Sequence, residues 1–109
     1  MWNHTQNVEN GTTVTIVCNL AATLPEWRGS PVEAHGTVYN YQNDTKFNPA
    51  LGQEKLSRLR WAANNRDLTL SPVTRDDAGT YQCLYITQSW KVSLVVRGMF
   101  YSFSILVRQ

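Results

Sequence analysis

Apolar residues recur at every second position in four segments of the chain, residues 14–20, 68–70, 81–85 and 101–107. A period of two is typical of β-strands that bury one face and expose the other. Turn-forming pairs such as Asn10-Gly11 and Asn64-Asn65 separate these segments. Many short strands joined by turns predict an all-β sandwich rather than a helical protein.

One stretch, residues 53–61, has a spacing that suits a helix, although only weakly. Its apolar residues Leu56 and Leu59 lie three positions apart. Residues 59–61 also have the pattern of a strand that begins there. We therefore expect a strand in this part of the chain.

Composition limits the size of the protein and the classes of partner. With 109 residues and a mass of 12.4 kDa, the chain is expected to form a single domain over residues 1–109. A net charge of +2 without a run of Lys or Arg disfavours binding to nucleic acid. No apolar run approaches the ~18 residues of a membrane span, so we expect no insertion into a membrane by this segment.

The sequence also lacks the groupings that metal sites and enzymes need. The cysteines Cys18 and Cys83 and the histidines His4 and His35 do not have the spacing of zinc or iron–sulfur ligands. There is no nucleophile elbow, H-E-x-x-H motif or P-loop. We expect no catalytic residues, no metal and no cofactor, and therefore a protein that is not an enzyme.

The most specific motif is formed by Asp77, Gly79, Tyr81 and Cys83, which resembles the D-x-G-x-Y-x-C signature of immunoglobulin-superfamily domains. This resemblance extends over roughly the whole chain and implies an immunoglobulin-like sandwich of two antiparallel sheets with Greek-key connections. In that fold Gly79 relaxes the backbone at a corner, and Tyr81 hydrogen-bonds back to the backbone. The resemblance also implies a B–F disulfide between the sheets, from Cys18 to Cys83; two free thiols are the alternative.

The resemblance further implies a V-type (V-set) domain. Domains of this type pair an arginine at the start of strand D with the aspartate of the motif, here Asp77. Arg58 and Arg60 are both candidates, and Arg58 fits the strand start better. Arginines that are merely solvated are the alternative.

The sequence departs from the family at the tryptophan that normally packs on the disulfide, about 12 to 14 residues after the first cysteine. Residues 30–32 occupy that window and include no tryptophan. In one register Trp27 begins strand C, and the segment from Thr37 forms strand C′. In the other, the segment from Thr37 is strand C, with Val38 or Tyr39 in place of the tryptophan. We favour the second register, which makes the B–C segment long and places Trp27 in it.

Aromatic residues toward the C-terminus predict a surface for protein recognition. More strand-like sequence follows Cys83 than one F–G hairpin needs, so we expect a long, protruding hairpin or an extra strand after strand G. Loops on a rigid sandwich carry contacts, and Trp, Tyr and Arg are favoured at binding hot spots. The expected contact residues are Trp90, Met99, Phe100 and Tyr101, with Trp27 at the same end; the alternative is that several of them fill the core. Of Tyr39 and Tyr41, one is expected in the core.

Three N-x-[ST] sequons begin at Asn3, Asn10 and Asn43. Together with the implied disulfide they favour an extracellular glycoprotein, secreted or exposed on a membrane protein. Chance matches in a chain rich in Asn and Thr are the alternative. The F–G hairpin and the B–C segment carry no sequon, which we expect to leave them free to contact a partner.

The function that these features favour is recognition of another cell-surface or immune protein, as in receptors, ligands and adhesion molecules. Ig-like domains of herpesvirus and adenovirus immune-evasion glycoproteins are similar in their sequons, in the missing tryptophan and in the L-T-L…D-x-G-x-Y run, which host domains share, so the resemblance includes a viral version without separating virus from host. The alternative is a structural module that forms a homodimer or packs on a neighbouring domain. A carbohydrate site that uses Arg97 is a third, weaker hypothesis.

Overall fold

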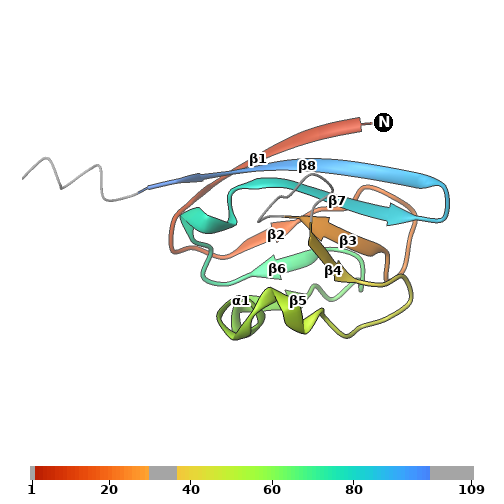
Figure 1. Ribbon diagram of the computed structural model, residues 1–109. Helices are drawn as coiled ribbons and strands as arrows, with labels where there is room; N and C mark the ends of the chain where they lie inside the picture. Colours follow the sequence, from red (N-terminus) through yellow and green to blue (C-terminus); the bar gives the residue numbers. More distant parts are fainter. Residues whose placement is uncertain (1, 30–36, 99–109) are drawn as a thin grey trace, which may run out of the picture.

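Two β-sheets form the part of the chain that the computed structural model describes, residues 2–29 and 37–98 (Figure 1). The larger sheet contains, in spatial order, β1 (Trp2–Glu9), β8 (Gln88–Arg97), β7 (Gly79–Tyr85), β3 (Glu26–Gly29) and β4 (Thr37–Asn40). The smaller sheet contains β2 (Val14–Ile16), β6 (Leu68–Leu70) and β5 (Leu59–Trp61). Neighbouring strands are antiparallel except β1 and β8, which run parallel. The predicted β-sandwich is confirmed.

The hydrophobic core lies between the sheets and follows the predicted period of two. Leu68 and Leu70 are buried, with the partly exposed Thr69 between them, and Val92 and Leu94 are buried on β8. Each such side chain contributes about 1.5–3 kcal/mol on leaving water. The predicted strand over residues 14–20 is shorter, since β2 ends at Ile16. The predicted segment 101–107 lies outside the described residues.

A disulfide between Cys18 and Cys83 joins the two sheets, with the Cα atoms 6.0 Å apart. Both residues are fully buried. The bond confirms the expected pairing. Because it closes a loop over a sequence separation of 65, it is expected to stabilise the fold by about 4 kcal/mol through the loss of unfolded-chain entropy.

Trp27 is the core tryptophan, and the register that we favoured for strand C is wrong. Trp27 lies on β3, directly opposite Cys83 of β7, and is fully buried. The segment from Thr37 forms β4, the next strand outward, as in the other register. The pairing shifts between Trp27 and Arg28, and Trp27 N donates to the buried Asn40 Oδ1 (2.9 Å). The tryptophan reaches the disulfide only nine positions after Cys18 because the connection to β3, residues 19–25, is short.

The strand expected over residues 53–61 is only partly correct. Residues 59–61 form β5, but α1 (Gln53–Arg58) precedes it, after the short 3-10 helix η1 (Pro49–Leu51). The helix places Lys55 and Arg58, three positions apart, on one face, where both are buried. The apolar pattern missed it because polar side chains occupy its buried face.

Candidate functional site

The aspartate of the sequence motif is the centre of a buried cluster of charges. Asp77, at the end of the 3-10 helix η2 (Arg75–Asp77), is only 1% exposed. Arg58 donates from Nη1 to Asp77 Oδ2 (2.7 Å) and from Nη2 to Oδ1 (3.1 Å), which confirms the expected pair. Lys55 Nζ also donates to Asp77 Oδ1 (2.6 Å), a contact that the sequence did not predict. Burial alone would raise the pKa of Asp77, but the hydrogen bonds from Arg58, Lys55 and the backbone of Thr74 outweigh it and lower the pKa to about 2.

Tyr81 continues this cluster as the expected tyrosine corner. Its hydroxyl donates to the backbone oxygen of Asp77 (2.6 Å) and accepts from Lys55 Nζ (3.3 Å). Gly79 has a φ of 139°, which a residue with a side chain rarely adopts, and it thereby forms the corner at the start of β7. Gly29 lies so close to the Tyr81 ring that a Cβ atom there would overlap it. All of these groups hold the fold together, and none forms an accessible site.

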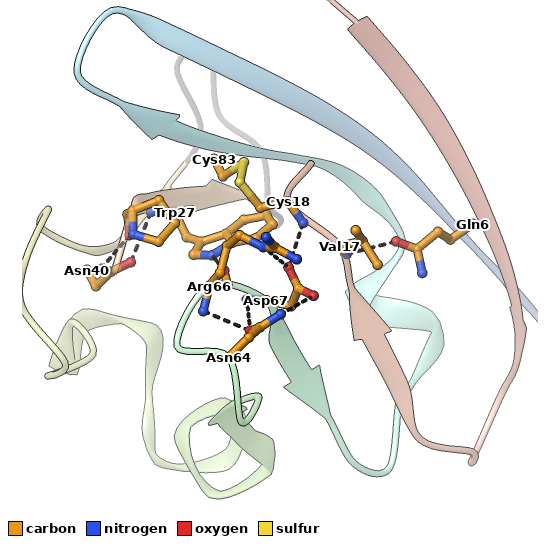
Figure 2. Close-up of a disulfide and its surroundings, with 10 residues drawn as sticks. Gln6, Val17, Cys18, Trp27, Asn40, Asn64, Arg66, Asp67 and Cys83 are labelled. Atoms are coloured by element: carbon orange, nitrogen blue, oxygen red, sulfur yellow. Dashed lines mark hydrogen bonds and ion pairs between the residues drawn. A yellow bond between two sulfur atoms is a disulfide. The ribbon is translucent and has the colours of Figure 1, made fainter. Parts of the chain in front are cut away.

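A second buried network supports the disulfide, as Figure 2 shows. Asp67 Oδ1 accepts from Cys18 N (2.9 Å) and from Arg66 Nε (3.2 Å), and Asn64 Nδ2 donates to Asp67 Oδ2 (2.9 Å). The indole Nε1 of Trp27 donates to the backbone oxygen of Arg66 (2.9 Å). Trp27 is therefore a structural residue, and the expectation that it contacts a partner is wrong.

Trp90 lies near the turn between β7 and β8 but on the inner side of the sheet. It pairs with Cys83 across the ladder and packs, partly buried, against the core. Its indole Nε1 is buried and has no hydrogen-bond partner among the described residues. With residues 19–21 and 87–89 it lines a hollow of about 820 Å³. The other expected contact residues, Met99, Phe100 and Tyr101, lie outside the described residues.

The large apolar side chains most exposed in the described part of the chain are Ile86 (76%), Tyr41 (67%) and Val95 (41%). Tyr85 pairs with Gln88, so Ile86 occupies a two-residue turn at the tip of the β7–β8 hairpin. Ile86 N donates to Gln42 Oε1 (3.2 Å), which joins this turn to the segment after β4. We call Tyr41, Gln42, Ile86 and Thr87 the hairpin end of the sandwich. Tyr39, by contrast, is fully buried, so one of the two tyrosines is in the core, as expected.

Ile86 has a φ of 58°. The left-handed region costs an ordinary L-residue roughly 1–2 kcal/mol, and it is least suited to a β-branched side chain. Two-residue hairpin turns usually place Gly, Asn or Asp at such a position. The chain thus holds an exposed isoleucine in an unfavourable conformation, which points to a role outside folding.

Next to the hairpin end, the outer face of the larger sheet is mixed in character. Glu26 and Arg28 alternate with the buried Trp27 and form an ion pair of 2.6 Å. Leu84 and Lys91, on β7 and β8, alternate with buried residues in the same way.

The structure places the three sequons at different parts of the sandwich. Asn3 is on β1, and Asn10 lies in the turn after β1, where its N–H donates to the backbone oxygen of Arg97 (2.7 Å). Asn43 is exposed, and its N–H donates to Leu24 O (2.9 Å) in the B–C segment. Asn43 also follows Gln42 directly, so it lies beside the hairpin end. The β7–β8 hairpin and the B–C segment carry no sequon of their own, and their freedom to contact a partner stays a prediction.

Within residues 2–29 and 37–98 there is no group of three or more His, Cys, Asp or Glu residues arranged to bind a metal ion. Over the same residues, no helix has the length and apolar character to cross a membrane.

No family model matches the chain, and a comparison with curated proteins gives no match. Among solved structures, it is similar to the first Ig-like domain of human CD48, with 21% identity over 88% of this chain and 83% of that one and a TM-score of 0.64. It is also similar to the second Ig domain of the mouse polymeric immunoglobulin receptor (19% identity, 86% and 95% of the chains, TM-score 0.63). The CD2-binding domain of CD58 is a third similar structure (16% identity, 86% and 53%, TM-score 0.61). Sheet order, disulfide and structural similarity together establish that the chain has the immunoglobulin fold.

Proposed function

We propose that this domain is a V-type immunoglobulin module of an extracellular glycoprotein that binds another cell-surface or immune protein and catalyses no reaction. The observation that carries the proposal is the hairpin end, where Tyr41 and Ile86 are both exposed and a hydrogen bond from Ile86 N to Gln42 joins the two turns. Tyrosines and apolar anchors at the centre of a patch are typical hot spots. The hollow lined by Trp90 extends the same end, and Met99, Phe100 and Tyr101 stay in the proposal as contacts to be tested.

Two features of the larger sheet support the V-type assignment. β4 lies outside β3, at the place where variable-type domains add strand C′. Arg58 and Asp77 form the ion pair that the resemblance implies for this type. Strand C′ widens the sheet next to the hairpin end and so enlarges the face that a partner can contact.

Two further features support an extracellular location. The disulfide is of the kind that persists in oxidising compartments. The three sequons are sites for N-linked glycans in the secretory pathway.

The CD58 domain, which is described as CD2-binding, is an example of a similar sandwich that recognises a protein.

A binding screen tests the proposal. A tetramer of the domain is incubated with an array of human cell-surface ectodomains and immunoglobulins, which covers both adhesion and viral immune evasion. We expect a saturable interaction that Ile86→Asn and Tyr41→Ala weaken at least tenfold, since each removes an exposed anchor. Val95→Thr is the matched control, because Val95 is an exposed apolar residue toward the far end of β8. Equal loss in all three variants would contradict the assignment to the hairpin end.

A homophilic module is the second candidate, and β1 favours it. In the described sheet β1 is an edge strand of eight residues that pairs only with β8. An open edge of this length can add a strand from a second copy. Sedimentation that shows a dimer at micromolar concentration, together with an empty binding screen, would favour this candidate.

A further inference from the structure

The sequon at Asn43 lies in a closed turn next to Tyr41. Asp44 N donates to Tyr41 O (3.0 Å), which closes the turn, and the hydrogen bond from Asn43 N to Leu24 O ties it to the B–C segment. Asn43 has a φ of 67°, in the left-handed region that Asn tolerates better than most residues. Asn40 Nδ2 holds the turn from inside, by donating to Tyr41 O (3.0 Å) and to Asp44 O (3.2 Å). The position of Asn43 relative to Tyr41 is therefore fixed.

Ile86 reaches the same turn from the β7–β8 hairpin. Its N–H donates to the side chain of Gln42, the residue between Tyr41 and Asn43. Because consecutive Cα atoms are about 3.8 Å apart, the Cα atoms of Asn43 and Tyr41 are at most about 7.6 Å apart. An N-linked oligosaccharide is bulky compared with this distance. Any glycan on Asn43 thus begins directly beside the hairpin end.

We propose that Asn43 carries an N-linked glycan that covers Tyr41, flanks Ile86 and limits the access of a protein partner to the hairpin end. The effect on partner access rests on the proposed function, whereas the covering of Tyr41 does not. Asn10 provides the contrast, because it is joined to Arg97 at the far end of β8. At about 3.3 Å per residue, that strand separates Asn10 from Ile86 by roughly 30 Å. A glycan on Asn10 leaves the hairpin end uncovered.

A pair of variants at Thr45 isolates the glycan. Thr45→Ser keeps the sequon and Thr45→Ala removes it, while the backbone oxygen that accepts from Trp61 Nε1 (2.9 Å) remains in both. The Thr45 side chain is exposed, so both variants are expected to keep the melting temperature of the parent chain. Asn10→Gln removes the distant glycan and serves as the control for glycan loss in general.

The three variants are produced in a mammalian cell line, and intact mass measures the glycan occupancy of each. Hydroxyl-radical footprinting then compares the modification rates of Tyr41 and Ile86, with Val95 as the internal reference. We expect Tyr41 and Ile86 to react several-fold faster in Thr45→Ala than in Thr45→Ser, and Asn10→Gln to behave as Thr45→Ser. An unoccupied Asn43 would overturn the proposal, and so would equal rates in the two Thr45 variants.

Partner binding is the second measurement on the same proteins. With any partner found in the screen, Thr45→Ala is expected to bind several-fold more tightly than Thr45→Ser. Equal or weaker binding by Thr45→Ala, with Asn43 glycosylated in Thr45→Ser, would contradict the proposal that the glycan limits partner access to the hairpin end. If no form binds a protein, the proposed function fails, and the footprinting result alone decides whether the glycan covers the hairpin end.

Discussion

Asp77 compensates the charges of two buried cationic side chains, Arg58 and Lys55. The contribution of this cluster to stability therefore depends on the Asp77 carboxylate. Arg58 and Lys55 both donate to it, and their side chains are less than a tenth exposed. Removing one partner of a buried ion pair is costly, since the remaining charge is left without compensation. The cluster is therefore a strong requirement of the fold even though its net contribution, relative to apolar residues, is modest.

Asp77→Ala is expected to lower the free energy of unfolding by about 3–5 kcal/mol, because Arg58 and Lys55 then stay buried without their carboxylate. Urea denaturation at neutral pH measures this loss. Glu54→Ala is the control: Glu54 also pairs with Arg58, but its side chain is 75% exposed. Exposed pairs contribute about 0–1 kcal/mol, so the control is expected to remain close to the parent chain. Similar losses in both variants would contradict a special role for Asp77.

The pKa of Asp77 predicts how stability changes in acid. The pKa is about 2 in the folded state and 3.8 for an unperturbed aspartate. The stabilisation is fully present above the higher value and is lost as the pH falls toward 2. A difference of this size corresponds to on the order of 2 kcal/mol. Urea unfolding at pH 5, 4, 3 and 2 is expected to show this decline, and Asp77→Asn is expected to show a smaller one. The same decline in both proteins would contradict the assignment.

At the scale of elements, β3 is a central strand of the larger sheet and carries the core tryptophan. It is four residues long, yet it pairs with both β7 and β4 and carries Trp27 onto the disulfide. Gly29 at its end lets the Tyr81 ring pack against the backbone. A short strand with this many contacts has little tolerance for changes in side-chain volume.

Trp27→Ala is expected to destabilise the domain by about 3–5 kcal/mol, because it leaves a large cavity beside the disulfide. Val38→Ala is the matched control, since Val38 on β4 is only partly buried and would cost less. Thermal or urea unfolding of the two variants measures the difference. A larger loss of stability for Val38→Ala would mean that Val38 of β4, and not Trp27, fills the core position beside the disulfide. That result would contradict the strand register in the structure.

The strands and the disulfide could be predicted because alternation and the D-x-G-x-Y-x-C motif both report on burial. The position of Trp27 could not, because the family spacing assumes a longer connection to strand C, whereas only residues 19–25 separate Cys18 from β3. The burial of Lys55 and its hydrogen bond to Asp77 could not be predicted either, because a pattern of apolar residues does not identify a buried lysine. The hairpin end depends on Gln42 and Ile86, which meet across 44 positions of sequence, and no local pattern encodes that contact.

At the scale of the whole molecule, the buried charge cluster and the two most exposed large apolar side chains described, Ile86 and Tyr41, lie at opposite ends of the sandwich. The end with η2 and α1 carries the buried charges that stabilise the fold. The hairpin end carries exposed apolar groups and a hollow. Substitutions at the two ends are therefore expected to affect different properties, stability at the first and partner binding at the second.

Ile86→Asn is expected to move stability and binding in opposite directions. Asn tolerates the positive φ at this turn, so the variant should gain about 1 kcal/mol in the free energy of unfolding. The same change removes the most exposed of the large apolar side chains described, and partner binding should weaken. Urea unfolding and the tetramer binding assay, on one preparation, measure the two effects. A gain in stability without a change in binding would mean that the isoleucine is not a contact. A loss of stability would mean that the isoleucine packs favourably at this turn and that its positive φ does not destabilise the fold.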